Sequence, residues 1–170
     1  SGGVTGTYVR IASDLSNALD NGYEHRVLAV LGKGSIRNME DLLLLKGIDI
    51  AIVQSDVLEF SRRENLHHDQ IVDRVNYITK LYNEEFHVLA HQDVQSLQDL
   101  AGAKVNFGIS GSGTEMTASI IFDTLGLEIE RTSFDQGLAL EKLKAGEIDA
   151  QVYVAGKPTR LFSDVHAEDN

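Results

Sequence analysis

The sequence contains no cysteine, which excludes structural disulfides, thiolate zinc sites and cysteine nucleophiles. It also lacks a long apolar run: the four leucines at 42–45 fall far short of the roughly 18 residues that a membrane-spanning helix needs. The sequence has no excess of basic residues: it contains 26 acidic and 15 basic residues, and its net charge is −11. Such a surface repels nucleic acid and anionic lipid, so we expect neither as a partner.

The overall composition is that of a soluble globular protein. Its 170 residues suffice for one ordinary domain or two small lobes. Hydrophobic residues make up 42% and charged residues 24%, close to the average for such proteins. Because the overall field is negative, local dipoles and hydrogen bonds would have to hold any anionic ligand. Helix starts and polar turns are therefore the places where a site is expected.

Helix and strand signals alternate along the chain. The spacing of apolar residues predicts helices at 7–19, 38–45, 95–100, 115–125 and 137–144, and one or two more within 57–81. Ser35 is the predicted cap of the helix at 38–45. Short apolar runs that end in glycine or polar residues predict strands at 26–31, 48–53, 86–90, 104–109 and 148–154. This alternation favours an α/β fold in which helices cover both faces of parallel sheets.

Two stretches of the sequence are alike. Residues 45–51 and 143–150 both carry a helix end, a glycine stop, an Ile-Asp pair and the start of a strand. Two interpretations remain open. Any corner of helix, glycine and strand can look like this, or the chain is built of two similar α/β lobes with a ligand cleft between them.

The strongest local motif is a turn that follows a predicted strand and opens a predicted helix. It reads Ser110-Gly111-Ser112-Gly113-Thr114. Backbone N–H groups at a helix start lack partners and the dipole there is positive, so an anion is stabilised. Glycines let a ligand approach the backbone, and the hydroxyls of Ser110, Ser112 and Thr114 add hydrogen bonds. The alternative is that Ser112 or Thr114 only caps the helix.

Three further turns have the same small, polar character and also precede helices. They are Gly6-Thr7-Tyr8, Gly34-Ser35 and Gln54-Ser55-Asp56. Open α/β sheets place ligand contacts at the carboxyl ends of their strands, where the last two of these turns are predicted. Tyr8 either lies over a ligand or is an ordinary core aromatic. Each turn alone is a weak signal, but the four together indicate a protein that binds a small anionic solute.

Signatures of catalysis are absent from these turns. No Gly-Lys-Ser/Thr follows the glycines, as a nucleotide P-loop requires, and Met116 stands where a dinucleotide fingerprint has its third glycine. A nucleophile elbow would need glycine where Ser112 stands. His87 and His91 lie four residues apart on a predicted strand, too far for a metal pair. We therefore expect a binding protein with no catalytic residues, no metal and no cofactor.

The four turns together resemble those of the periplasmic solute receptors of TAXI-type TRAP transporters. The resemblance rests on Gly6-Thr7-Tyr8, Gly34-Ser35, Ala51-Ile52-Val53-Gln54-Ser55-Asp56 and Gly111-Ser112-Gly113-Thr114-Glu115. The corner at 143–150 is also similar, and the match runs through nearly the whole chain in the same order. It implies a type II periplasmic-binding fold, in which two α/β lobes close over a solute.

The resemblance also implies how the lobes divide and which residues line the cleft. Lobe I would span 1–85, lobe II 86–162, and a return segment or tail 163–170. Lobe I would contribute Gly6, Thr7, Tyr8, Ser35, Gln54 and Ser55, and lobe II Ser110, Ser112, Gly113, Thr114 and Tyr153. The family has a strand before the first glycine turn and a long return segment. Neither is present here, so we expect lobe I to be incomplete.

The implied function is that of a bacterial receptor outside the cytoplasm, which the absence of cysteine fits. It would bind an anionic or zwitterionic solute, such as glutamate, another amino acid or a small carboxylate, and deliver it to TRAP permease subunits in the membrane. One alternative is a ligand-sensing domain of a signalling protein with the same fold. The other is an enzyme of this fold, against which the missing base–nucleophile set argues. The cations available to clamp a carboxylate are Arg10, Lys33, Arg37, Lys157 and Arg160.

Overall fold

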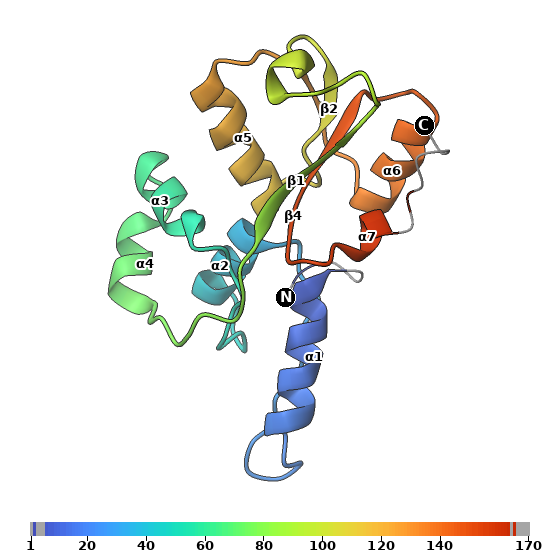
Figure 1. The fold of residues 1–170 in the computed structure, drawn as a ribbon. Helices are drawn as coiled ribbons and strands as arrows, with labels where there is room; N and C mark the ends of the chain where they lie inside the picture. The colour runs from blue at the N-terminus through green and yellow to red at the C-terminus, as the bar shows by residue number, and fades with distance from the viewer. Residues whose placement is uncertain (1, 3–5, 164, 166–170) are drawn as a thin grey trace. The chain divides into compact units, whose positions relative to one another are not determined.

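The computed structural model describes residues 2, 6–163 and 165 (Figure 1). The chain divides into two compact units: unit 1 comprises Ser1–Leu81 and Gly111–Gly113, and unit 2 comprises Tyr82–Ser110 and Thr114–Asn170. Its mixture of helices and strands confirms the predicted α/β class. The predicted tail at 163–170 lies mostly outside the described residues, and the lobe boundaries inferred from the family resemblance stay a prediction.

The helices described in unit 1 are α1 (Thr7–Leu19), α2 (Ser35–Leu44), α3 (Asp56–Arg63) and α4 (His68–Arg74). Helix α1 confirms the predicted helix at 7–19, and α3 and α4 show that the stretch expected to hold one or two helices holds two. Helix α2 differs, because Gly34 occupies its N-cap position and no side chain caps it. The prediction that Ser35 caps this helix is therefore wrong. Its hydroxyl is bonded to other segments of unit 1 instead.

The predicted strands at 26–31 and 48–53 are not formed. Among the described residues, neither segment has a backbone ladder to another strand. A ladder needs a neighbouring strand, and the apolar pattern of a segment says nothing about whether that neighbour exists. Both predictions were therefore wrong, although the patterns that suggested them are plain in the sequence.

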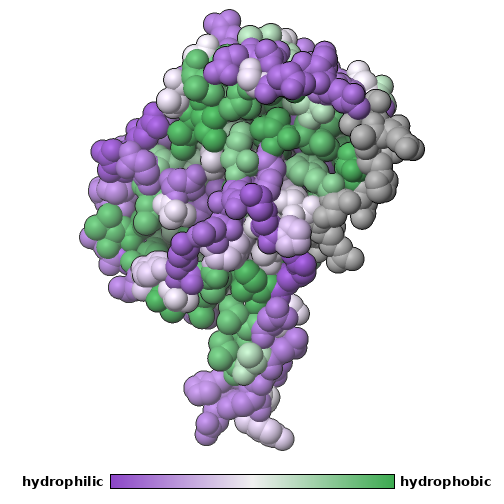
Figure 2. Space-filling view, in the orientation of Figure 1, coloured by the Kyte–Doolittle hydropathy of each residue, from purple (hydrophilic) through white to green (hydrophobic). Residues whose placement is uncertain are grey.

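Helix side chains bond single carbonyl groups of these two segments. Ser16 Oγ donates to the carbonyl of Val27, and Asn38 Nδ2 donates to the carbonyl of Ile52 at 2.8 Å. The apolar side chains that a paired sheet would cover remain exposed, and Figure 2 shows hydrophobic surface alongside α1. The most exposed of them in the two segments are Leu28 at 69%, Ile50 at 62%, Leu31 at 57% and Val30 at 50%.

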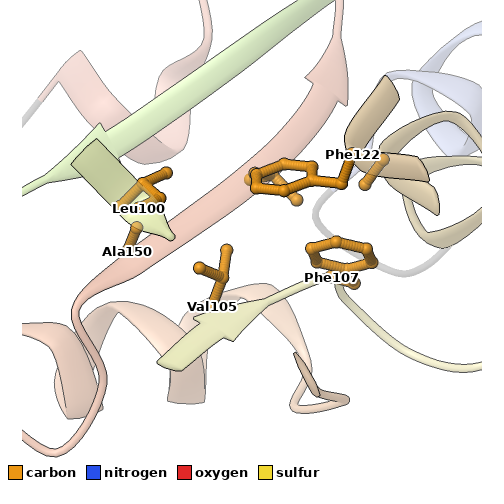
Figure 3. Close-up of a cluster of buried hydrophobic side chains, with 7 residues drawn as sticks. Leu100, Val105, Phe107, Phe122 and Ala150 are labelled. Atoms are coloured by element: carbon orange, nitrogen blue, oxygen red, sulfur yellow. The ribbon is translucent and has the colours of Figure 1, made fainter. Parts of the chain in front are cut away.

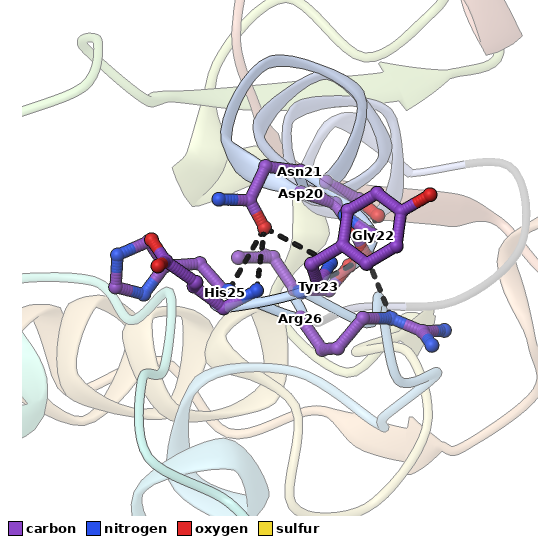
Figure 4. Close-up of polar contacts among 9 residues, drawn as sticks. Asp20, Asn21, Gly22, Tyr23, His25 and Arg26 are labelled. Atoms are coloured by element: carbon purple, nitrogen blue, oxygen red, sulfur yellow. Dashed lines mark hydrogen bonds and ion pairs between the residues drawn. The ribbon is translucent and has the colours of Figure 1, made fainter.

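Polar side chains fix the turn that follows α1 (Figure 4). Asp20 accepts hydrogen bonds from the backbone N–H of Gly22 at 2.7 Å, from that of Val27 at 3.2 Å and from Arg26 Nε at 3.2 Å. The next residue, Asn21, accepts bonds at 2.9 to 3.1 Å from three successive backbone N–H groups, those of Tyr23, Glu24 and His25. Asp and Asn are favoured in such turns because their short side chains bond the backbone a few residues on.

This turn carries a pH prediction. The hydrogen bond from Gly22 is the largest cause that lowers the pKa of Asp20 below its ordinary value; Val27 and Arg26 lower it further, and desolvation partly opposes them. A pKa that is lower in the folded state means that the ionised carboxylate stabilises the turn above its unfolded pKa, and that this is lost as pH falls through the folded pKa. We expect NMR of the Asp20 carboxyl carbon to report a pKa below the ordinary value of an aspartate. Asp20→Asn should remove this part of the pH dependence of unfolding, and an unchanged dependence would contradict the assignment.

Unit 2 contains a four-stranded sheet. Its strands are β1 (Glu85–Ala90), β2 (Lys104–Asn106), β3 (Glu130–Thr132) and β4 (Ala150–Ala155), in the order β1-β4-β2-β3. Strand β2 runs parallel to β3 and β4, but β1 pairs antiparallel with β4. The prediction of a parallel sheet is thus wrong at this edge, because periodicity shows which face a residue takes and not the direction of the strand. The short strand β3 carries no apolar pattern and was not predicted.

Helices cover both faces of this sheet, as predicted (Figure 1). Helix α5 (Gly113–Leu125) contributes Phe122 to a buried cluster on one face, with Leu100, Val105, Phe107 and Ala150 (Figure 3). Helix α6 (Gln136–Lys144) covers the other face, where Gln151 bonds to it. The expected short helix at 95–100 is a single 3-10 turn, Leu97–Leu100, and a final helix, α7, spans Arg160–Ser163.

Candidate functional site

Three of the predicted site residues meet in unit 1. Tyr8 lies in the first turn of α1, Ser35 begins α2, and Gln54 precedes α3. Ser35 Oγ accepts the backbone N–H of Gln54 at 2.9 Å and lies 3.0 Å from the hydroxyl of Tyr8. The same oxygen lies 3.3 Å from Gln54 Oε1. The fold therefore joins three of the polar turns that the sequence shows as separate.

The glycine turn at 111–113 packs against this cluster within unit 1. The backbone N–H of Arg37, in the first turn of α2, donates to the carbonyl of Gly111 at 3.3 Å. A Cβ at Gly113 would overlap the carboxamide of Gln54 and would lie 2.9 Å from Ser35 Oγ. The carboxamide and the hydroxyl therefore occupy the space that a side chain at this position would need. The backbone of the turn thus approaches the polar cluster directly.

Gly34 makes the second close approach. Its φ of 115° and ψ of −171° fall in a region that essentially only glycine adopts. A Cβ on Gly34 would lie 3.2 Å from Ser112 Cα. Backbone conformation and contact therefore both require glycine at this position.

The members of the site in unit 1 differ in what a solute can reach. Ser35 is fully buried and Tyr8 is 8% exposed. Gly113 is also buried, and Ser55 is exposed at the start of α3. The half-buried positions are Gly6, Thr7, Gln54 and Ser112.

The remaining predicted residues belong to unit 2. Thr114 is 6% exposed, and its Oγ1 accepts the backbone N–H of Val154 at 3.2 Å, which ties α5 to β4. Tyr153 is half-buried, with its ring edge-on to that of Phe162 at a centroid distance of 6.2 Å. Ser110 is exposed. Thr114 therefore has a structural partner that the sequence did not indicate.

The candidate cations differ in whether acidic neighbours already neutralise them. Arg37 pairs with Glu40 at 3.0 Å and with Asp41 at 3.3 Å, and Lys157 pairs with Glu85 at 2.6 Å. The side chain of Arg160 lies outside the described part of the chain. The other two candidates, Arg10 and Lys33, are exposed and form no ion pair with a described residue.

Asn38 is a buried polar residue beside the cluster that sequence reasoning missed. It is 3% exposed, and its Oδ1 has no hydrogen-bond partner among the described residues. It stands three positions after Ser35, on the same face of α2. That spacing is the signal that could have found it, because two polar residues on an otherwise core-facing stripe usually have partners.

A second buried polar group lies within unit 2, between the sheet and α6. Gln151 is fully buried, and its Nε2 donates to the carbonyl of Gln136 at 2.8 Å and to Gln136 Oε1 at 2.5 Å. Beside it on β2, Asn106 Oδ1 accepts the backbone N–H of Phe134 at 2.8 Å. These contacts fix the segment that enters α6. Nothing local in the sequence predicts them, because the partners are 15 and 28 residues away.

Two further findings concern metals and membranes. No group of three or more His, Asp or Glu residues that could hold a metal ion occurs in the part of the chain that the structure describes. In that same part, no helix is long and apolar enough to cross a membrane.

Known proteins provide an independent comparison. A model of the NMT1-like family matches residues 1–170. Among solved structures, the amino acid ABC transporter substrate-binding protein AbpA from Streptococcus pneumoniae, bound to L-arginine, is 20% identical with a TM-score of 0.51. That match covers 84% of this chain and 55% of AbpA. A mutant of ArgBP from T. maritima is 19% identical with a TM-score of 0.48, over 86% of this chain and 56% of that one.

The likeness to AbpA shows the fold. It is the α/β fold of type II periplasmic-binding proteins, as the resemblance of the turns implied. The chain spans little more than half the length of AbpA.

Proposed function

The chain belongs to the NMT1-like family, and from this premise we propose that it is a solute receptor for a membrane transporter. In this proposal it binds a small anionic or zwitterionic solute outside the cytoplasm, either an amino acid such as glutamate or a small carboxylate. It then delivers the solute to TRAP-type permease subunits. AbpA, which shares the fold, is a substrate-binding protein bound to an amino acid, and this supports the class of ligand.

The observation that carries the proposal is the convergence of Tyr8, Ser35 and Gln54 on the bare backbone of Gly113. Two hydroxyls and a carboxamide from three segments gather where glycine lets the main chain of a fourth segment come close. Ligand sites have this composition: a few convergent polar groups fix the orientation of a small molecule. The cluster itself contains no charged side chain. Hydrogen bonds are therefore its means of recognition, and these suit a zwitterion as well as an anion.

We propose that the residues which the sequence indicated contribute to solute binding, either by contact or by positioning the groups that make contact. In unit 1 these are Gly6, Thr7, Tyr8, Ser35, Gln54, Ser55, Ser112 and Gly113, and in unit 2 they are Ser110, Thr114 and Tyr153. Arg10 and Lys33, which form no ion pair with a described residue, are the candidates for a charged contact to a carboxylate.

Native mass spectrometry of the purified chain tests the proposal. We expect a small molecule to be carried through purification, and its mass gives the chemical class. Titration calorimetry with L-glutamate and with succinate then measures affinity directly. A chain that carries no small molecule and binds neither probe would contradict the receptor function.

Ser112→Ala tests the glycine turn as part of the site. The side chain is half-buried, and its hydroxyl is not needed for the close approach of Gly34, which meets Ser112 Cα. We expect the Kd for the bound solute to rise roughly 10- to 100-fold, the value of a hydrogen bond to a charged group. Circular dichroism should show an unchanged fold. Ser13→Ala, at an exposed position of α1, is the matched control and should leave the Kd unchanged; equal effects of the two variants would remove Ser112 from the site.

A further inference from the structure

The hydroxyl of Ser35 has three polar neighbours within the protein, which leaves it no hydrogen bond for a solute. The side chain is fully buried in unit 1. Its oxygen lies 2.9 Å from Gln54 N, 3.0 Å from the Tyr8 hydroxyl and 3.3 Å from Gln54 Oε1. A serine hydroxyl offers one proton and two lone pairs, so three partners use its full capacity.

The chemistry of the partners fixes the direction of each bond. The backbone N–H of Gln54 can only donate, so Ser35 Oγ accepts there. Gln54 Oε1 can only accept, so the Ser35 proton points to it. The remaining lone pair of Ser35 then accepts the phenolic proton of Tyr8. A directed chain of hydrogen bonds therefore runs from Tyr8 through Ser35 to the Gln54 carboxamide.

We propose that Ser35 is a positioning residue of the solute site: it does not touch the solute but fixes the orientation of Tyr8 and Gln54 relative to each other. This inference rests on the proposed function and changes the role that the sequence gave to Ser35. The residue links α1 to the segment before α3, and Gly113 packs against the same oxygen. Replacing it with alanine removes the acceptor that the Tyr8 hydroxyl and the half-buried Gln54 N–H share.

Asn38 provides the matched control. It is buried on the same face of α2 and bonds the same segment, through the carbonyl of Ile52 at 2.8 Å. Among the described residues it forms no hydrogen bond with Tyr8, so Asn38→Ala should loosen the segment without breaking the chain of bonds. A purely structural role for Ser35 predicts that the two variants behave alike.

The first test uses the chain without solute. The five tyrosines are labelled with ¹³C at Cζ, and Tyr8→Phe assigns the Tyr8 resonance. We expect Ser35→Ala to shift the resonances of both the Tyr8 Cζ and the Gln54 amide proton. Ser35→Thr should restore both resonances, and Asn38→Ala should leave the Tyr8 resonance unchanged. Tyr8→Phe should shift the Gln54 amide in the wild-type background and not in Ser35→Ala. If Tyr8→Phe leaves the Gln54 amide of the wild-type chain unmoved, the positioning role is overturned.

The second test measures affinity for L-glutamate by calorimetry. We expect Ser35→Ala to raise the Kd about 10-fold, Ser35→Thr to restore it, and Asn38→Ala to leave it within about 2-fold at a temperature where both variants are folded. An unchanged Kd in Ser35→Ala would overturn the proposal. If the wild-type chain binds neither L-glutamate nor succinate, it is the receptor function that fails, and the coupling between Tyr8 and Gln54 is still decided by the NMR test.

Discussion

Replacing Gly34 with alanine is expected to lower the free energy of unfolding by about 1–3 kcal/mol, the cost of a side chain in a conformation reserved for glycine. The first cause of this loss is backbone strain, because Gly34 has a φ of 115° and a ψ of −171°. The second is steric, since the new Cβ would lie 3.2 Å from Ser112 Cα, a backbone atom that cannot rotate away. The glycine turn must then shift, so we also expect weaker solute binding. Urea denaturation followed by circular dichroism measures the first effect, and calorimetry the second.

Gly47→Ala separates the two causes. Gly47 also has a positive φ, of 85°, but a Cβ there meets no atom within 4 Å. It should therefore lower stability through backbone strain alone and leave the Kd unchanged. If Gly34→Ala and Gly47→Ala prove equal in both measurements, the contact between Gly34 and Ser112 does not shape the site.

Phe122→Ala is expected to have the largest effect on unit 2, about 3–5 kcal/mol of unfolding free energy. The ring is fully buried at the centre of the cluster shown in Figure 3, with its centroid 5.1 Å from that of Phe107. Removing it costs the burial of the ring and leaves a cavity that close-packed neighbours cannot fill. Because α5 lies over the sheet through this ring, we expect the loss to appear as a lower urea midpoint in circular dichroism. The chain has no tryptophan, so fluorescence is a poorer probe.

Leu125→Ala on the same helix is the control for this prediction. Leu125 is 45% exposed at the end of α5, so its truncation removes little buried surface and creates no enclosed cavity. We expect a loss below about 1 kcal/mol. Comparable losses for the two variants would mean that the cluster around Phe122 is not the main source of stability in unit 2.

Local sequence patterns predicted the elements whose backbone hydrogen bonds are local. The apolar spacing of 7–19 predicted α1 at its observed bounds, and the glycine stops predicted the ends of α5 and α6 to within a residue or two. The four polar turns were found in the same way, because glycine and small hydroxyl residues before a helix mark a local conformation. Family resemblance added the fold, which the likeness to AbpA confirms.

Strand pairing was beyond the reach of such patterns. The segments 26–31 and 48–53 have the composition of strands but no ladder among the residues that the structure describes, and β1 runs opposite to the predicted direction. A hydrogen-bonded ladder is a property of two segments, so one segment cannot specify it. Residue type therefore indicated where strands were possible and not which of them would form.

The candidate site shows the same division. The sequence by itself determined which residues are small, polar and placed at helix starts, and so picked out Ser35 and Thr114 as candidates. Only the tertiary structure decided what their hydroxyls do: Ser35 is surrounded by Tyr8 and Gln54, and Thr114 bonds the backbone of Val154. The partners lie 19 to 40 residues away along the chain. A hydroxyl takes whichever donor or acceptor the fold brings within about 3 Å, and that distance is set by packing between segments.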